Sequence, residues 1–168
     1  MPAPGSRLGI AASTSSLLRC TPAIVIIGLG ALVAAACHRD VQLTAPSILR
    51  GGFVDDYGTR HQIDDSLWRH GTANRYRVTE WNATSRFLIA RNDSANVADA
   101  GRYDRIDWVL LSGEDGWSWA FCLVTWNAPS EAAARAATGA DTAHPRTGCS
   151  GYPFTRMRRS RPDPGGAP

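Results

Sequence analysis

The chain has no lysine: all 18 of its basic residues are arginine, against 15 acidic residues and 4 histidines. We attribute this absence to nucleotide composition and give it no functional weight. The sequence also lacks a GxSxG motif, a P-loop and a paired CxxC, which removes the evidence for the hydrolase, nucleotide-binding and redox classes that use them. We therefore expect a protein without catalytic activity and without a cofactor.

No apolar run is long enough to cross a bilayer as a helix. The longest, residues 22–36, has about 15 residues, whereas a spanning helix needs roughly 20. Arg7 and Arg19 supply positive charge upstream, and no acidic residue occurs before Asp40. This layout is typical of a secretory signal. We expect the segment to be removed rather than to remain as a membrane span.

Three alanines, at 34 to 36, stand directly before Cys37. The segment resembles the lipobox of bacterial lipoproteins, although Ala34 stands where that family usually has leucine. The resemblance implies that residues 1–36 are a signal peptide and that Cys37 is lipidated as the mature N-terminus. Two or three acyl chains make membrane attachment lasting. His38 stands where lipoproteins kept in the inner membrane often have aspartate, which favours the outer membrane of a bacterial cell envelope.

Cleavage before Cys37 would leave 132 of the 168 residues, which suffices for one domain with a modest core. Arg7 and Arg19 would leave with the signal, so 16 basic residues would face 15 acidic ones. A body this close to neutral argues against nucleic-acid binding. We expect the partners to be the membrane, through the lipid, and a glycan or protein ligand.

The remaining chain divides by composition into three parts. Residues 37–50 are mixed and polar, which predicts a tether between the lipid and the fold. Residues 51–155 are rich in aromatic and branched side chains broken by turn-forming sets, which predicts a single β-rich domain. Residues 156–168 are rich in arginine, proline and glycine, which predicts a disordered tail.

Alternating apolar and polar residues predict two clear hairpins, over 75–91 and 102–126, and a less secure one over 51–70. The strand over 117–126 is apolar on both faces, which indicates a covering element. Ser130 can cap a short helix that Gly139 ends. The chain thus predicts a mainly β fold, an antiparallel meander of about six strands with one short C-terminal helix. We expect it to close into a small barrel or sandwich of the general kind that lipocalin-like domains use.

Two cysteines, Cys122 and Cys149, remain in the predicted domain. In an oxidising envelope compartment they are expected to pair. The bridge would close a loop of about 27 residues and contribute roughly 3.5 kcal/mol through chain entropy. The alternative makes Cys149 a nucleophile with His144 as its base. This is the weaker hypothesis, because the thiol would have to stay reduced and no third catalytic residue is identifiable.

Histidines and aspartates raise the question of a metal site. His61, with aspartates nearby, and His70 could bind a transition metal, and several aspartates suggest calcium: those at 55, 56, 64, 65, 93 and 99. The histidine spacing is a common accident, and no segment fits the calcium loop D-x-[DN]-x-[DN]-G. We therefore predict no metal site, with surface or edge-strand histidines and turn-forming aspartates.

Six tryptophans are the most informative surplus in the chain. Alternation places Trp81 on the face opposite Tyr76 and Val78, and Trp68 on the face opposite Ile63. Trp68 and Trp81 are therefore candidates for an exposed binding surface, where flat rings stack on a sugar or a protein. The alternative is that the tether, the helix or a neighbouring strand covers them.

Six segments also resemble a loose group of short uncharacterised bacterial surface lipoproteins: GGFVDDYG, HQIDDSLW, IARND, RIDW, the FC at 121–122 and GCSGYPF. The resemblance supports the domain limits and the pairing of Cys122 with Cys149, and carries no activity. Two functions stay open: a lipid-anchored, non-catalytic β-domain that binds a glycan or protein, and a structural or assembly lipoprotein of the outer membrane. An enzyme ranks third, since it would need a pocket that joins His61 or His144 with carboxylates.

Overall fold

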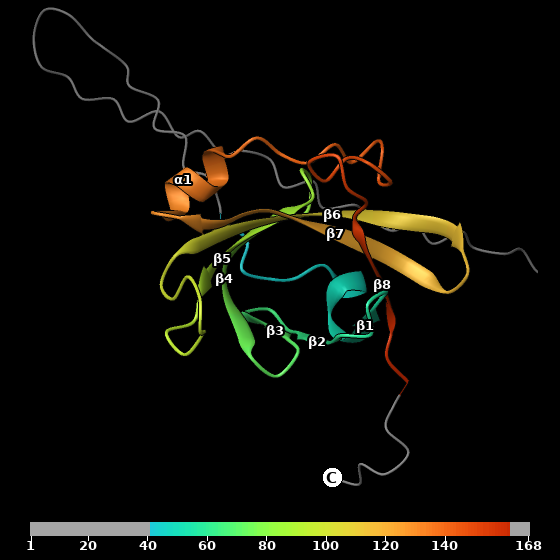
Figure 1. Ribbon diagram of the computed structural model, residues 1–168, viewed down its shortest axis with the longest axis horizontal. Helices are drawn as coiled ribbons and strands as arrows, with labels where there is room; N and C mark the ends of the chain where they lie inside the picture. Colours follow the sequence, from blue (N-terminus) through green and yellow to red (C-terminus); the bar gives the residue numbers. More distant parts are fainter. Residues whose placement is uncertain (1–40, 162–168) are drawn as a thin grey trace, which may run out of the picture. The chain divides into compact units, whose positions relative to one another are not determined.

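Eight antiparallel strands close into a barrel in the computed structural model, which describes residues 41–161 apart from the side chains of Gly113 and Glu114 (Figure 1). Each strand pairs with the next, and the last returns to the first. The strands are β1 (Gly51–Asp55), β2 (Arg60–Ile63), β3 (Leu67–His70), β4 (Asn74–Asn82), β5 (Phe87–Asn92), β6 (Tyr103–Glu114), β7 (Trp117–Ala128) and β8 (Thr155–Arg159). The predicted mainly β barrel is confirmed. Cys37 and the predicted signal lie outside the described residues.

One of the two additional strands comes from residues 51–70, which form three strands rather than one hairpin. The chain turns between β2 and β3, where the Asp64 carboxylate accepts hydrogen bonds from the backbone N–H groups of Ser66 and Leu67 at 2.9 and 2.8 Å. Aspartate favours such turns because its short side chain bonds the backbone a few residues on. Asp64 and Asp65 therefore mark a turn between two strands.

The other additional strand is β8, which lies in the predicted disordered tail. It pairs with β1 on one side and β7 on the other, so it closes the ring. Its central residue, Met157, is fully buried in the core. The prediction of disorder from residue 156 is therefore wrong for residues 156–159. Burial of one side chain and pairing on both edges outweigh the arginine-rich composition.

Aromatic side chains fill the interior of the barrel. Phe53, Trp68, Trp119 and Phe121 pack edge to face or tilted, with ring centroids 5.0 to 6.2 Å apart for the pairs in contact. Such arrangements follow from the ring quadrupoles. Small barrels of this strand number are normally filled by their own side chains. A large ligand therefore has to bind on the outside.

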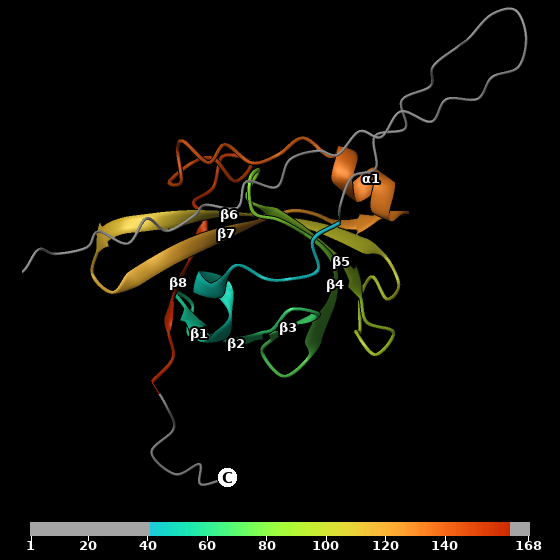
Figure 2. The same ribbon diagram turned by 180° about the vertical axis from the view of Figure 1, so that it is seen from behind.

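The N-terminal segment also belongs to the barrel. Residues 41–50 cross the ring (Figure 2, cyan), and a short 3-10 helix, η1 (Ser47–Leu49), leads into β1. Ala45 and Leu49 are buried in the core cluster. The prediction of a tether up to residue 50 is therefore wrong for residues 41–50. We call the end of the barrel where β1 begins the proximal end, and the opposite end the distal end.

Two coverings shield the outer faces of β5, β6 and β7 (Figures 1 and 2). The helix α1 (Glu131–Ala136) packs Ala134 against Phe87 and Ile89, and its cap Ser130 accepts a hydrogen bond from a first-turn N–H. The connector 137–154 covers the outer face of β6 and β7. These coverings explain why β7 is apolar on both faces. Within residues 41–161, no helix is long and apolar enough to span a membrane.

Candidate functional site

Trp68 and Trp81, predicted as an exposed binding pair, are buried, with 1% and 2% of their surfaces exposed. Ile63 lies on β2 and Trp68 on β3, where they are register partners and both face inward. The alternation of inward and outward residues stops at the turn between the two strands, so the face of Trp68 cannot be counted from Ile63. A β-bulge between Val78 and Glu80 reverses the alternation of β4 before Trp81. The predicted tryptophan surface is therefore wrong. Both residues are part of the core.

His61 lies inside the barrel and is bonded at both ring nitrogens. Its Nε2 is 3.0 Å from Asp55 Oδ2, and its Nδ1 is 3.0 Å from the indole nitrogen of Trp68. An indole N–H can only donate, so Nδ1 accepts, and Nε2 carries the hydrogen and donates to Asp55. Burial lowers the pKa of His61, and Asp55 offsets part of that effect. The prediction of a surface or edge histidine is wrong for His61, which is held neutral in one tautomer.

Asp55, His61 and His70 form the group that a metal ion could use. Their ligand atoms lie within 4.8 Å of one another, and the two imidazole rings stack with centroids 4.6 Å apart. A neutral histidine that binds a metal through Nε2 carries its hydrogen on Nδ1, which needs an acceptor. Trp68 places a donor there instead. A metal would have to break this hydrogen bond, so the group suits a neutral histidine better than a metal ligand.

Asp104 is a second titratable group enclosed by the barrel. Its Oδ1 accepts a hydrogen bond from Asn92 at 2.8 Å, and within the described residues its Oδ2 has no partner. Burial raises the pKa of Asp104 to about 7, against the lowering effect of Asn92. Burial, with the Asp104 charge, also raises the pKa of Tyr76 to about 12. A carboxyl that titrates near neutrality can serve acid–base chemistry, but this one is fully buried, so a substrate would not reach it.

Cys122 and Cys149 form a disulfide, with their Cα atoms 5.5 Å apart, which confirms the predicted pairing. The bond ties the connector 137–154 to β7. It also removes the hypothesis of a nucleophilic Cys149, because the thiol is consumed. His144 pairs instead with Asp141, at 2.7 Å, on the surface.

A cleft of about 260 Å³ opens beside this connector. Its apolar lining includes Leu111, Ala120 and Phe154, and its polar lining comprises Asp56, Arg146 and Arg156. Exposed Tyr57 and Tyr152 are sequence neighbours of lining residues. Drug-sized ligands usually occupy roughly 300 to 1,000 Å³, so this cleft suits one side chain or a single sugar ring.

The outer surface of β3, β4 and β5 carries arginines in register, which we call the arginine face. Arg69 lies directly opposite Arg75, and Arg77 lies directly opposite Arg91. All four are exposed. Like charges directly opposite one another destabilise a sheet. Within residues 41–161 only one of the four, Arg77, forms a salt bridge, with Asp93 at 2.6 Å. Arg69 and Arg75 are also attracted at longer range by Asp64 and Asp93, so the four arginines of the face interact with two carboxylates and the face keeps an excess of positive charge.

Sequence reasoning missed the arginine face although part of the signal was present. Tyr76 and Val78 were predicted to share an apolar face, which places Arg75 and Arg77 on the outside. The cross-strand partners Arg69 and Arg91 could not be assigned, because register depends on the turns that β3 and β5 make.

No protein-family model, no curated protein and no solved structure matches the chain. The function therefore has to be argued from the geometry of the chain itself.

Proposed function

We propose that this protein is a lipid-anchored component of the bacterial outer membrane whose barrel binds acidic glycans through the arginine face, without catalysing a reaction. The observation that carries the proposal is that arginines lie directly opposite each other on neighbouring strands twice, as Arg69 with Arg75 and as Arg77 with Arg91. The anchor rests on Cys37 and the alanines before it.

The chemistry of the arginine face favours an acidic polymer. A guanidinium group binds carboxylate, sulfate or phosphate through two parallel hydrogen bonds. Neighbouring strands lie about 4.8 Å apart, so several guanidinium groups can contact one chain of charged sugars at once, which raises the overall affinity. Tyr103 lies opposite Arg91 on β6 and keeps part of its ring exposed, which suits stacking on a sugar.

Two features support binding on the outside rather than chemistry on the inside. The core fills the ring, and the interior titratable groups Asp55, His61 and Asp104 are buried. Both ring nitrogens of His61 are also hydrogen-bonded, one to Asp55 and the other to Trp68. Catalytic groups must touch a substrate, whereas Asp55 and His61 contact each other and Asp104 contacts Asn92.

The anchor is tested by expressing the full chain in a bacterial envelope, with Cys37 intact and with Cys37→Ala. Intact mass and membrane fractionation are measured for both. We expect acyl mass and outer-membrane recovery for the wild type alone, because acylation needs the cysteine sulfur. Equal masses without lipid would contradict the anchor and leave glycan binding as a separate question.

Glycan binding is tested with polygalacturonate, and neutral dextran serves as the uncharged comparison. The double variant Arg75→Gln with Arg77→Gln is expected to bind polygalacturonate at least about tenfold more weakly, since the loss of one charge-assisted hydrogen bond is worth roughly 1.5 to 3 kcal/mol. The matched control, Arg158→Gln with Arg161→Gln, removes the same charge from exposed positions outside the face.

Equal weakening in both double variants would show binding to net charge rather than to the arginine face. No binding of the wild type would contradict the glycan ligand and favour the structural or assembly lipoprotein instead. Since exposed charges are screened by salt, binding should also weaken between 0.05 and 0.5 M sodium chloride, roughly as the Debye length shortens from about 14 to about 4 Å.

The second candidate is a protein partner at the connector cleft. Arginine and tyrosine are enriched among residues that dominate binding energy, and Arg146, Tyr57 and Tyr152 are exposed in or next to the cleft. Arg156 is held in place by an ion pair with Asp56 at 3.0 Å. A glycan-negative protein whose interaction with a partner is lost in Tyr152→Ala would favour this function.

A further inference from the structure

Four exposed apolar side chains gather at the proximal end of the barrel. Val41, Leu43 and Ile48 belong to the N-terminal segment, and Leu110 lies on the proximal half of β6. Their exposed fractions are 47%, 61%, 39% and 44%. Exposed large apolar side chains also occur at the distal end, at Tyr57, Val97 and Trp126, so what sets the proximal group apart is that three of its members belong to one short segment next to Cys37.

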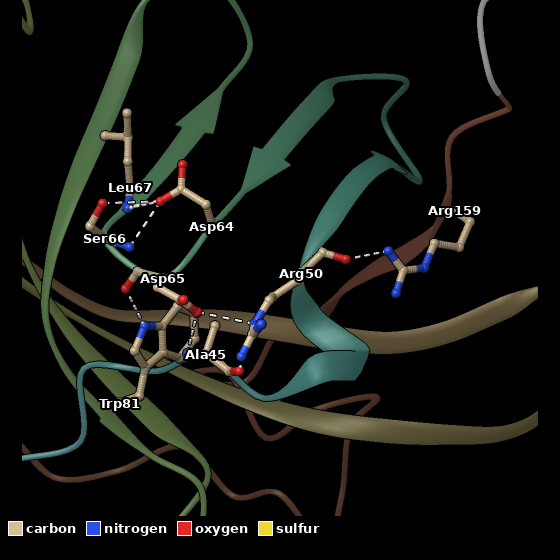
Figure 3. Close-up of polar contacts among 8 residues, drawn as sticks. All are labelled: Ala45, Arg50, Asp64, Asp65, Ser66, Leu67, Trp81 and Arg159. Atoms are coloured by element: carbon tan, nitrogen blue, oxygen red, sulfur yellow. Dashed lines mark hydrogen bonds and ion pairs between the residues drawn. The ribbon is translucent and has the colours of Figure 1, made fainter.

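These side chains are presented by a backbone that is fixed to the barrel (Figure 3). The Asp65 carboxylate accepts a hydrogen bond from the Ala45 N–H and forms an ion pair with the Arg50 guanidinium, both at 3.0 Å. The indole of Trp81 donates to the Asp65 carbonyl at 2.8 Å, and the Trp81 N–H donates to the Gln42 carbonyl at 2.7 Å. With Ala45 and Leu49 buried, the segment is a rigid part of the proximal end rather than a loose tether.

The chain between the anchor and this fixed segment is short. Cys37 precedes Val41 by four residues, which span at most about 14 Å when fully extended. An acylated Cys37 would therefore hold the proximal end close to the bilayer surface, and the distal end would point away from it. A free tether up to residue 50 would have imposed no such orientation.

Arginines accompany the apolar residues at this end. Arg159, which is exposed, donates to the backbone carbonyl of Arg50 (Figure 3). It also donates to the backbone carbonyl of Ile48. Arginine at a membrane surface keeps its guanidinium among the lipid phosphates and its stem along apolar surface. The Asp64 carboxylate at the same end is engaged by Ser66 and Leu67 in the β2–β3 turn.

We propose that the proximal end docks on the bilayer surface, with Val41, Leu43, Ile48 and Leu110 entering the headgroup region. The proposal rests on the lipid anchor at Cys37 and deepens it by assigning the membrane-facing surface. The arginine face then runs along the side wall of the barrel, and its ligand approaches from the side rather than through the membrane.

The test uses the lipidated full chain in vesicles of phosphatidylethanolamine and phosphatidylglycerol. Single cysteines are introduced by Leu43→Cys or Ile48→Cys and labelled with a polarity-sensitive dye, and the disulfide keeps Cys122 and Cys149 from reacting. Val97→Cys, in the loop between β5 and β6 at the distal end, is the matched control, since Val97 is 96% exposed. Quenching is measured with spin-labelled lipids and with aqueous iodide.

We expect lipid-borne quenching at 43 and 48, with iodide access several-fold lower than at 97, because interfacial groups lie roughly 5 to 10 Å into the headgroup boundary. Equal iodide access at all three positions in a lipidated, vesicle-bound protein would overturn the docking surface and leave the anchor intact. A protein without acyl mass that does not sediment with vesicles would overturn the anchor, and the docking proposal with it. Labelling two positions separately, 43 and 48, ensures that a local disturbance by the dye at one position does not decide the result.

Discussion

The Asp55–His61 pair inside the barrel and the arginine face outside it show opposite arrangements of charge. Inside, Asp55 and His61 bond each other, and Trp68 completes the second bond of the imidazole. Outside, Arg69, Arg75 and Arg91 lie opposite like charges and within the described residues form no salt bridge, while Arg69 and Arg75 interact at longer range with Asp64 and Asp93. Polar groups that stabilise a fold are paired, because leaving them unpaired in the interior is costly. Like charges held opposite one another on the surface are therefore the better guide to function here, and the paired groups of the interior are the better guide to stability.

The strongest test of this comparison replaces one tryptophan on each side. Trp68→Ala should lower the free energy of unfolding by about 3 to 5 kcal/mol, because it empties core volume and removes the donor to His61. Trp126→Ala, at a side chain 53% exposed, should change it by less than about 0.5 kcal/mol. Urea denaturation followed by circular dichroism measures both. Similar losses would contradict the division into a structural interior and a free exterior.

Loss of the disulfide should lower the free energy of unfolding almost as much as Trp68→Ala, because the disulfide holds the connector over β6 and β7. The double variant Cys122→Ser with Cys149→Ser should lose roughly 3 to 4 kcal/mol of unfolding free energy, as expected for a closed loop of this length. Thermal melts of the double variant, and of the wild type under reducing conditions, measure the loss. A double variant as stable as the oxidised wild type would mean that packing alone keeps the connector in place.

Local pattern was enough to predict the two long hairpins, the barrel and the disulfide, because alternation and cysteine pairing depend on neighbours or on few alternatives. It failed for Trp81, where a bulge between Val78 and Glu80 reverses the faces of β4. It also failed for β8, because only closure of the ring buries Met157. The arginine face required cross-strand register, which no single segment encodes.

The buried titratable groups predict how stability depends on pH. The folded pKa values of His61 and His70 are lowered, so their contribution is present above their unfolded value of 6.5 and is lost as the pH falls below it. The folded pKa of Asp104 is raised to about 7, so its contribution is present below its unfolded value of 3.8 and is lost as the pH rises towards 7. The two effects oppose each other between these limits.

Asp104→Asn isolates the contribution of Asp104 to the pH dependence of stability, since asparagine keeps an acceptor for Asn92 and does not titrate. The variant should gain stability relative to the wild type as the pH rises from 4 to 7, and the gain should level off above 7. We expect a gain on the order of 2 kcal/mol, less than the whole pKa shift implies, because the new amide is itself buried. Urea titrations at five pH values measure it, and a pH-independent difference would show that Asp104 ionises normally in the fold.

The smallest expected change in the free energy of unfolding tests whether the arginine face destabilises the fold. Arg75 lies opposite Arg69 and two residues before Arg77 on the same face of β4. Arg75→Gln should therefore relieve repulsion and raise the free energy of unfolding by about 0.2 to 1 kcal/mol, while it weakens binding to polygalacturonate. The control is Arg135→Gln, which breaks the ion pairs with Glu80 and Glu131, both at 2.6 Å, and should destabilise the protein. Low-salt urea titrations resolve the difference, because screening at high salt should erase the gain at Arg75 but only part of the loss at half-buried Arg135. A destabilised Arg75→Gln would mean that these arginines are held by favourable contacts, and the excess charge would no longer indicate a ligand.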